Sequence, residues 1–478
     1  MRLNTTLVKS TVVAALGGLL FGFDTAVIAG ATSALQRLFA LSPAMLGLTV
    51  ASALYGTILG AMFAGIPGDR WGRRASLRVL AVLYLVSALG CALAWNWASF
   101  VASRFLCGLA IGGSSVLGPM YIAEIAPARW RGRLVGFFQF NIVFGILLAY
   151  FSNYLVGLAG FGDAEWRWKL GVAAAPAALF LLMLYTIPET PRWLAKKQRV
   201  DEAGEVLRLN GEPDWQKALT EIVASLDAEH GHADEPLFQP KYLKLMLIAI
   251  AIGMFNQLSG INAILYYLND IFARAGFDKV SSDLQAVAVG FTNLVSTIIA
   301  MSVIDRIGRR SMLLVGSVGC AASLAGVAWI FSTQAHQHLL VWLLVSFIAF
   351  FAFSQGAVIW VYLSEIFPTR VRAKGQSLGS FTHWAMNALI SGIFPVIAAE
   401  SGAAPFVLFA AMMVAQFFVV LLFFPETKGH TLEEMQHRLG IDCPKRVCFG
   451  RKRRRHRFAL PPSEPRLEGA RRASAGTG

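Results

Sequence analysis

Three short motifs in the first half of this 478-residue chain return in the second half at nearly the same spacing. The pairs are 69–74 with 305–310, 121–132 with 362–373, and 188–190 with 425–427. Each copy of the first motif lies between two long apolar segments, so it forms a short charged loop. Such a repeat predicts two related membrane halves in one polypeptide, the architecture of many secondary transporters.

Composition agrees with a membrane protein. Charged residues make up 15% of the chain, against about 25% in soluble globular proteins. The apolar residues lie in blocks of about 20, the length that a helix needs to cross a bilayer. We predict twelve transmembrane helices, at 10–31, 45–66, 77–95, 98–120, 134–158, 169–188, 243–267, 285–304, 311–332, 339–363, 373–398 and 404–424.

The repeat and the spans together predict an all-α membrane protein with two six-helix bundles. The first apolar block is long enough to span and carries Asp24 near its middle, so we interpret it as an uncleaved first helix. Helical patterns at 200–209 and 216–226 predict short helices in the linker. The expected divisions are the N-terminal bundle 1–188, the cytoplasmic linker 189–240, the C-terminal bundle 241–430 and a basic, largely disordered tail 431–478.

Lysine and arginine gather in one set of alternate loops, and the positive-inside rule places those loops and both termini in the cytoplasm. The other loops hold fewer basic residues, among them Lys169 and Lys279, which are diluted by acids such as Glu165. The net charge of +14 reflects this bias and the basic tail. We therefore expect a cell (inner or plasma) membrane protein with lipid around it and no nucleic-acid partner.

With these motifs the chain resembles the sugar porter family of the major facilitator superfamily, and bacterial sugar–proton symporters in particular, over roughly residues 10–435. The resemblance implies two bundles that open a central cavity alternately to either side of the membrane. It implies a transporter rather than an enzyme, with no cofactor and no metal site. It also implies a chain that functions as a monomer.

Neutral amides and aromatic residues within the spans indicate the substrate. Polar side chains are costly in lipid and usually face a cavity. An amide donates and accepts hydrogen bonds, so an amide-lined cavity suits a neutral monosaccharide, a hexose or a pentose. Each amide alone has an alternative role in an interhelical hydrogen bond. The resemblance places the substrate site at Gln139, Asn256, Gln257, Asn262, Asn293, Trp360, Trp384 and Asn387.

Three positions depart from the family pattern. Asn256 stands where sugar porters usually have glutamine, which shortens its reach by one methylene. Ala357 stands at the proline of the tenth span, so we expect a less kinked helix there. His383 stands where related porters often have an amide, and it either donates to substrate or titrates.

Asp24 lies within the first predicted span, where a carboxylate is costly unless it is paired or protonated. Arg104 in the fourth predicted span is its natural partner. The resemblance places an acid and an arginine here in bacterial sugar–proton symporters, whereas facilitative glucose carriers have an amide in place of Asp24. We therefore predict proton coupling through this pair, with a purely structural ion pair as the alternative. The other functions considered are a facilitative sugar uniporter and a transporter-like sugar sensor.

The repeated loop charges predict a gate on the cytoplasmic side. Acid–arginine pairs at helix ends can hold the two bundles together while the cavity faces outward, and they must break when it faces inward. The alternative is that these charges only set the topology. The predicted gate residues are Asp69, Arg70, Arg74, Glu124, Arg131, Asp305, Arg306, Arg310, Glu365 and Arg372.

Overall fold

The computed structural model describes residues 4–229, 235–368 and 370–429, and the regular elements in these ranges are helices. The first half holds α1 (Thr5–Val27), η1 (Ile28–Gly30), α2 (Thr32–Leu38), α3 (Pro43–Phe63), α4 (Gly65–Trp71), α5 (Arg73–Ala92), α6 (Trp97–Ile125), α7 (Ala128–Ala159), η2 (Gly162–Ala164), α8 (Glu165–Gly171) and α9 (Ala174–Met183). The linker holds α10 (Pro191–Lys196), α11 (Val200–Leu209) and α12 (Trp215–Glu229). The second half holds η3 (Pro240–Tyr242), α13 (Leu243–Leu258), α14 (Ile261–Tyr266), α15 (Leu268–Arg274), α16 (Lys279–Ile307), α17 (Arg309–Thr333), η4 (Gln337–Leu339), α18 (Leu340–Phe353), α19 (Gln355–Ile366), α20 (Arg372–Glu400) and α21 (Ala404–Phe423). The tail beyond residue 429 lies outside the described residues.

Eleven helical segments in the described ranges are long and apolar enough to cross a membrane. The sixth predicted span is different, because the chain turns at Val172 and Ala173 and divides it into α8 and α9. The prediction of one continuous helix over 169–188 is therefore wrong. With this two-part crossing, the structure has the predicted architecture of two six-helix bundles.

Two further spans are interrupted in their middle. The seventh breaks at Gly260, whose φ of 80° lies in the left-handed region that suits glycine. The tenth breaks at Ser354, where ψ is −86° and the side-chain Oγ donates to the Phe350 carbonyl at 2.6 Å. The tenth span lacks the family's proline, yet it is not a continuous helix, because α18 ends at Ser354.

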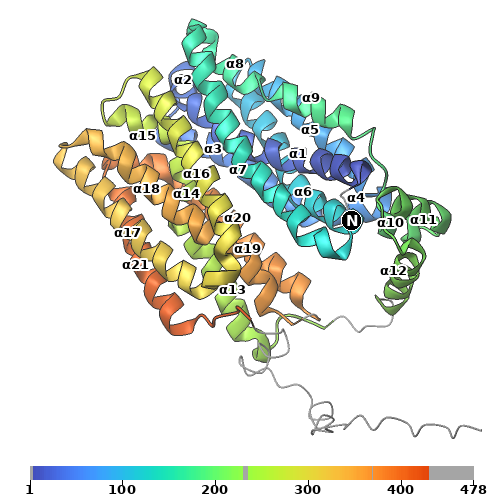
Figure 1. Ribbon diagram of the computed structural model, residues 1–478. Coiled ribbons are helices and arrows are strands. Elements are labelled where there is room, and N and C mark those ends of the chain that lie inside the picture. Colours follow the sequence, from blue (N-terminus) through green and yellow to red (C-terminus); the bar gives the residue numbers. More distant parts are fainter. Residues whose placement is uncertain (1–3, 230–234, 369, 430–478) are drawn as a thin grey trace, which may run out of the picture.

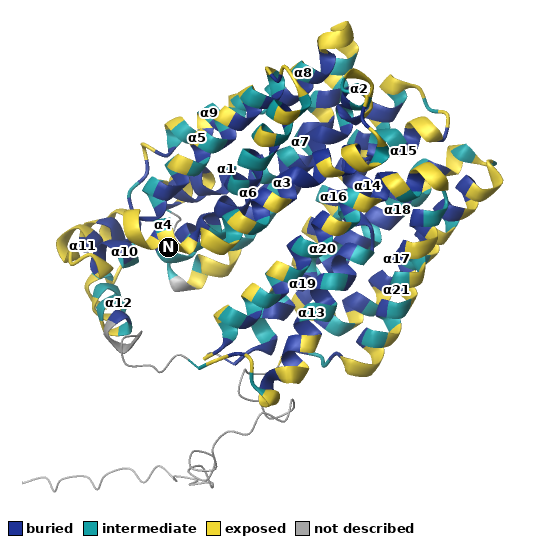
Figure 2. Ribbon diagram, turned by 180° about the vertical axis from the view of Figure 1, so that it is seen from behind, coloured by how far each residue is buried: buried dark blue, intermediate teal, exposed yellow. Residues whose placement is uncertain are grey.

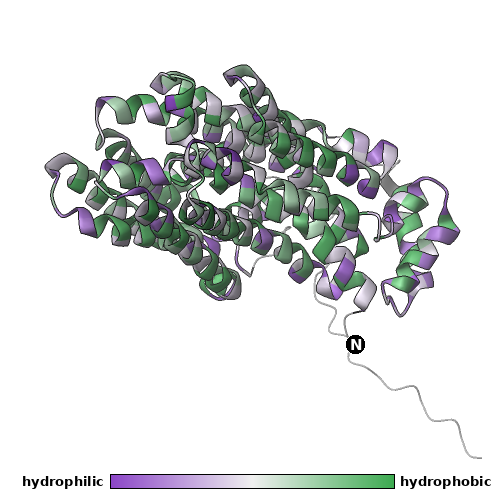
Figure 3. Cartoon of the chain, turned by 90° about the horizontal axis from the view of Figure 1, so that it is seen from above, coloured by the Kyte–Doolittle hydropathy of each residue, from purple (hydrophilic) through white to green (hydrophobic). Residues whose placement is uncertain are grey.

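Large apolar side chains cover much of the outer surface of the bundles. Trp342, Leu422 and Leu182 are 70%, 69% and 67% exposed, although each is strongly hydrophobic. Figure 2 shows exposed residues along the outer helices, and Figure 3 shows hydrophobic residues over most of their length. Such a surface needs lipid around it, so the chain is a multi-pass membrane protein.

The two bundles lie side by side, and α10–α12 lie at one end of the first bundle, here called the linker end (Figure 1). The bundles approach each other at the opposite end and diverge toward the linker end in both views (Figures 1 and 2). At the opposite end Ser33 donates to Asp270 at 2.6 Å, and Tyr150 donates to the Leu265 carbonyl at 2.8 Å. These contacts join the first bundle to the second.

Close helix packing inside the first bundle depends on glycine. A Cβ added at Gly108 of α6 would lie 1.8 Å from the Ala53 carbonyl oxygen of α3. No side chain fits at that distance, so the two backbones touch only because Gly108 has none. At Gly132 of α7, by contrast, a Cβ would meet nothing within 4 Å.

We predict that Gly108→Ala lowers the thermal unfolding temperature of the purified protein by several degrees. The new methyl group forces α3 and α6 apart, and overpacking of this kind costs about 1–3 kcal/mol. Gly132→Ala is the matched control and should leave the temperature unchanged or raise it slightly, because alanine favours helix. Equal melting temperatures for wild type and Gly108→Ala would contradict the packing argument.

Candidate functional site

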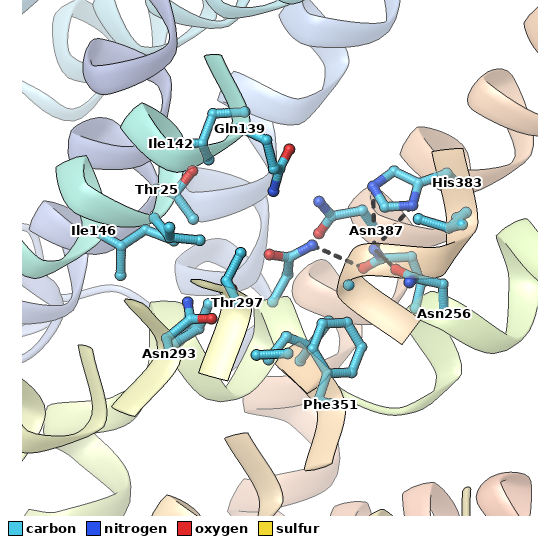
Figure 4. Close-up of a pocket in the computed structure, with 18 of the residues that line it drawn as sticks. Thr25, Gln139, Ile142, Ile146, Asn256, Asn293, Thr297, Phe351, His383 and Asn387 are labelled. Atoms are coloured by element: carbon cyan, nitrogen blue, oxygen red, sulfur yellow. Dashed lines mark hydrogen bonds between the residues drawn. The ribbon is translucent and has the colours of Figure 1, made fainter. Parts of the chain in front are cut away.

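A cavity lies between the two bundles near the middle of the spanning helices (Figure 4). It is partly open to solvent and encloses about 810 Å³ of space when that open part is included. The first bundle contributes residues of α1 and α7, and the second contributes residues of α13, α14, α16, α18, α19 and α20. The side chains that line it are Phe21, Thr25, Gln139, Ile142, Val143, Ile146, Asn256, Gln257, Ile261, Asn262, Leu265, Tyr266, Asn293, Thr297, Phe351, Ala352, Gly356, Ile359, Trp360, His383, Trp384 and Asn387.

The structure brings all eight predicted substrate residues to this one cavity. Gln139 alone among them comes from the first bundle, on α7. The other seven come from the second bundle, and they are Asn256, Gln257, Asn262, Asn293, Trp360, Trp384 and Asn387. The second bundle therefore supplies most of the polar surface, and the first bundle faces it with Phe21, Thr25 and Gln139.

Gln257 is the centre of an amide network on the wall of the cavity. Its Nε2 donates to Asn256 Oδ1 at 3.0 Å, and its Oε1 accepts from Asn262 Nδ2 at 3.0 Å. The break between α13 and α14 brings Asn262 back toward Gln257, five residues earlier. Asn387 is fully buried, and its Nδ2 has no hydrogen-bond partner among the described residues. Its Oδ1 accepts from Ser391 Oγ at 3.0 Å, so the Asn387 side chain is held at the wall of the cavity.

Aromatic rings form the second kind of surface. Trp360 is 39% exposed, and its ring lies 5.1 Å from that of His383. The His383 ring also lies 5.1 Å from Trp384, and both its nitrogens lie 3.3 Å from Gln257 Nε2. An indole presents an apolar face to the C–H groups of a sugar ring, while the amides and imidazole beside it reach hydroxyl groups.

The cavity also contains polar residues outside the predicted set of eight. His383, which we predicted either to donate to substrate or to titrate, lines the cavity, and Thr25 and Thr297 were missed. A hydroxyl group within an apolar span was the available signal for both threonines. It is a weak signal, because a helical threonine commonly bonds its own backbone, as Thr25 does to the Phe21 carbonyl at 2.9 Å.

Asp24 and Arg104 lie on the other side of α1 from the cavity. The Arg104 Nη1 donates to Asp24 Oδ1 at 2.5 Å, and the two side chains are 2% and 13% exposed, respectively. Phe21 and Thr25 of the same helix line the cavity, whereas Leu20 and Asp24 line a small pocket with Arg104. The α1 helix therefore lines the cavity with one face and carries Asp24 on the adjacent face.

The repeated loop charges form two matching clusters at the linker end. In the first bundle, Arg73 pairs with Asp69 at 3.0 Å and with Glu124 at 2.9 Å. In the second bundle, Arg309 pairs with Asp305 at 3.0 Å and with Glu365 at 2.8 Å. These ion pairs lie within a bundle. Burial acts to raise the pKa of Asp69, but Lys196 and Arg73 outweigh it and hold that pKa below its ordinary value.

A second acid in each cluster caps a helix. Glu189 accepts the backbone N–H groups of Arg73 and Arg74 at 3.0 Å, and Glu426 does the same for Arg309 and Arg310 at 2.9 and 3.1 Å. A carboxylate satisfies free N–H groups at a helix start and interacts favourably with its dipole. The prediction omitted these capping acids and the two central arginines, although all four occupy matching repeat positions.

The remaining predicted gate residues take other places. Arg70, Arg131 and Arg306 are exposed. Three others bond backbone carbonyls of their own bundle, and these are Arg74 to Ile187, Arg310 to Leu421 and Arg372 to Phe367.

Comparison with known proteins identifies the family. The model of the family described as "Sugar (and other) transporter" matches residues 10–439. The chain belongs to this sugar transporter family. It is 36% identical to the D-xylose-proton symporter of Escherichia coli (strain K12), over 89% of this chain and 94% of that protein. It is also 36% identical to the arabinose-proton symporter of Bacillus subtilis (strain 168), over 88% of this chain and 93% of that protein. The protein is accordingly a sugar transporter, not an enzyme.

Solved structures agree with this assignment and with the arrangement of the bundles. The inward open conformation of the xylose transporter XylE from E. coli matches with a TM-score of 0.81 at 35% identity, over 90% of this chain and 99% of that chain. The same symporter bound to 6-bromo-6-deoxy-D-glucose matches with a TM-score of 0.75, over 91% of this chain and 99% of that chain. The major facilitator fold is thereby confirmed.

We predict that Gln257→Ala weakens sugar binding about tenfold or more, because it removes the partner of Asn256 Oδ1 and of Asn262 Nδ2 in the wall of the cavity. Isothermal titration calorimetry with the purified protein measures the effect. Asn141→Ala is the matched control, since Asn141 is a buried amide on α7 that bonds the Phe137 carbonyl and does not line the cavity. Wild-type sugar affinity in Gln257→Ala would show that the sugar binds elsewhere.

Proposed function

We propose that this transporter couples the uptake of a neutral monosaccharide, a hexose or a pentose, to the entry of a proton across the cell membrane. The linker end faces the cytoplasm, and the cavity opens alternately to either side. The described lining residues include no carboxylate, lysine or arginine, and His383 is the one imidazole among them. This lining of amides and indoles supports a neutral polyol as substrate. A single chain supplies both walls of the cavity, so the monomer is the working unit.

The observation that carries the proposal is the Asp24–Arg104 pair behind α1. Asp24 is a carboxylate within the first spanning helix, and its partner Arg104 is buried beside it. A carboxylate in this position can carry a proton through the transport cycle. Protonation removes one charge from the pair and weakens the link between α1 and α6.

The same helix transmits this change to the sugar. Phe21 of α1 faces the cavity, and its ring lies 5.6 Å from that of Trp384 on α20. A sugar held by the second bundle therefore meets α1 when the two bundles close around it. Proton and sugar then favour the same rearrangement without touching each other, which is how two ligands become coupled.

We predict that Asp24→Asn abolishes sugar accumulation against a gradient and leaves sugar exchange partly intact. An amide of the same size preserves the packing but cannot carry a proton through the cycle. Proteoliposomes with an imposed pH gradient and labelled D-xylose, L-arabinose or D-glucose measure accumulation and counterflow separately. Asp163→Asn, an exposed acid at the opposite end, is the control. Accumulation by Asp24→Asn equal to that of the wild type would mean that the protein takes up its proton elsewhere, whereas no accumulation by the wild type would mean that the protein is a uniporter.

We further propose that the loop clusters hold the cytoplasmic ends of the bundles together when the cavity faces outward. In the present structure the bundles diverge at the linker end, and Arg73 and Arg309 pair within their own bundles. The pairs between bundles would therefore form only when the linker ends approach each other. The clusters then bias a two-state equilibrium and leave the sugar site untouched.

We predict that Glu124→Gln or Arg372→Ala shifts the population toward the inward-facing state and slows net uptake. Distances between spin labels on the cytoplasmic ends of the two bundles report the shift. Glu205→Gln, at an exposed position of α11, serves as the control. If both variants gave wild-type distances, the loop charges would serve topology alone.

A further inference from the structure

Four charged side chains from opposite bundles meet at the end remote from the linker. Lys169 Nζ of α8 lies 2.9 Å from Asp283 Oδ2 of α16. Beside it, Lys279 Nζ of α16 lies 2.5 Å from Glu165 Oε2 of α8. The two lysines and two acids balance in charge, and both ion pairs cross from the first bundle to the second.

The two pairs differ in burial. The side chains of Lys169 and Asp283 are 1% and 0% exposed, whereas Lys279 is 59% exposed. Removing one member of a buried pair strands an uncompensated charge, while an exposed pair is screened by water and contributes little. The Lys169–Asp283 contact therefore carries most of the electrostatic link between the bundles at this end.

Two glycines make room for the buried pair. A Cβ at Gly157 of α7 would lie 2.9 Å from Asp283 Oδ2. A Cβ at Gly30 would lie 2.9 Å from Cδ of Lys169. Both glycines belong to the first bundle, so its surface has space for the lysine stem and for a carboxylate that arrives from the second bundle.

Each member of the buried pair also has a partner in its own bundle. Lys169 Nζ lies 2.9 Å from Glu165 Oε1, and Asp283 Oδ1 accepts from Asn269 of α15. Burial acts to raise the pKa of Glu165, but Lys279 and Lys169 outweigh it and keep that pKa below its ordinary value. When the bundles separate at this end, the Lys169 ammonium keeps its contact with Glu165, and the Asp283 carboxylate keeps its hydrogen bond from Asn269. The contact can therefore break without stranding either charge.

We propose that Lys169 and Asp283 form an outer latch, a positioning pair that holds the extracellular ends of the bundles together while the sugar cavity opens to the cytoplasm. The latch releases once in each transport cycle, when water enters between α8 and α16. This inference rests on the proposed alternating access, and it adds the residues that stabilise one of the two states.

The test uses full-length protein in lipid nanodiscs, with Cys443 and Cys448 replaced by serine and spin labels at the exposed positions Leu38 and His338. Asp283→Asn keeps the size of the side chain and removes its charge, and it should raise the outward-open fraction about tenfold or more. Lys169→Met should do the same, and Lys169→Arg should keep the wild-type distances because it keeps the charge.

Lys279→Met is the matched control, since it removes an interbundle lysine of the same cluster that is mostly exposed; it should change the populations less than twofold. Wild-type spin-label distances in both Asp283→Asn and Lys169→Met would overturn the latch. A fall in melting temperature without a change in distance would show that the pair only stabilises the fold. The distances are read without sugar and without a pH gradient. Failure of the latch is therefore distinguishable from failure of sugar–proton coupling, which proteoliposome uptake reports.

Discussion

Buried cations held by carboxylates on neighbouring helices organise this molecule. An unpaired charge in a low-dielectric interior costs several kcal/mol, so each buried cation fixes the position of the helix that supplies its partner. Arg73 ties α5 to α6, Arg309 ties α17 to α19, and Arg104 ties α6 to α1. These three pairs act within a bundle. Lys169 and Asp283 instead join the two bundles, at the end where they meet.

This distribution separates the rigid parts of the protein from the parts that move. In the proposed cycle, pairs inside a bundle keep it intact while it moves as a body, and glycines such as Gly108 allow its helices to touch at the backbone. Contacts between the bundles must be reversible. At the opposite end, α7 packs on α16 and α3 on α20 through apolar surface, and polar contacts that water can replace lie beside them, such as Ser33 with Asp270 and Tyr150 with the Leu265 carbonyl.

The two bundles also divide the chemistry. The second bundle holds the amide network around Gln257 and the indoles, so it provides most of the groups that would recognise a polyol in the proposed function. The first bundle holds the Asp24–Arg104 pair. The α1 helix connects the two functions, because one of its faces lines the cavity and the other carries Asp24.

Much of this arrangement follows from the sequence, because a bilayer restricts the choices. Polar residues within apolar blocks must face a cavity or a partner, and this reasoning paired Asp24 with Arg104. The family resemblance supplied the eight substrate positions, and all eight line one cavity. Reasoning from the sequence failed where partners are distant in sequence or where a helix breaks. Lys169 and Lys279 were counted only as loop charges, since nothing local indicates that α8 meets α16. The break at Ser354 was missed because the argument considered proline alone, and a serine that bonds its own backbone achieves the same result.

The central claim is that sugar and proton cross together. The most direct measurement is the external pH of a weakly buffered suspension of proteoliposomes after sugar is added without any imposed gradient, with a potassium ionophore to dissipate the membrane potential. If one carboxylate carries the coupling, the medium should become alkaline on sugar addition, with about one proton taken up per labelled sugar that enters. Sugar entry at the same rate with no change in external pH would contradict the account.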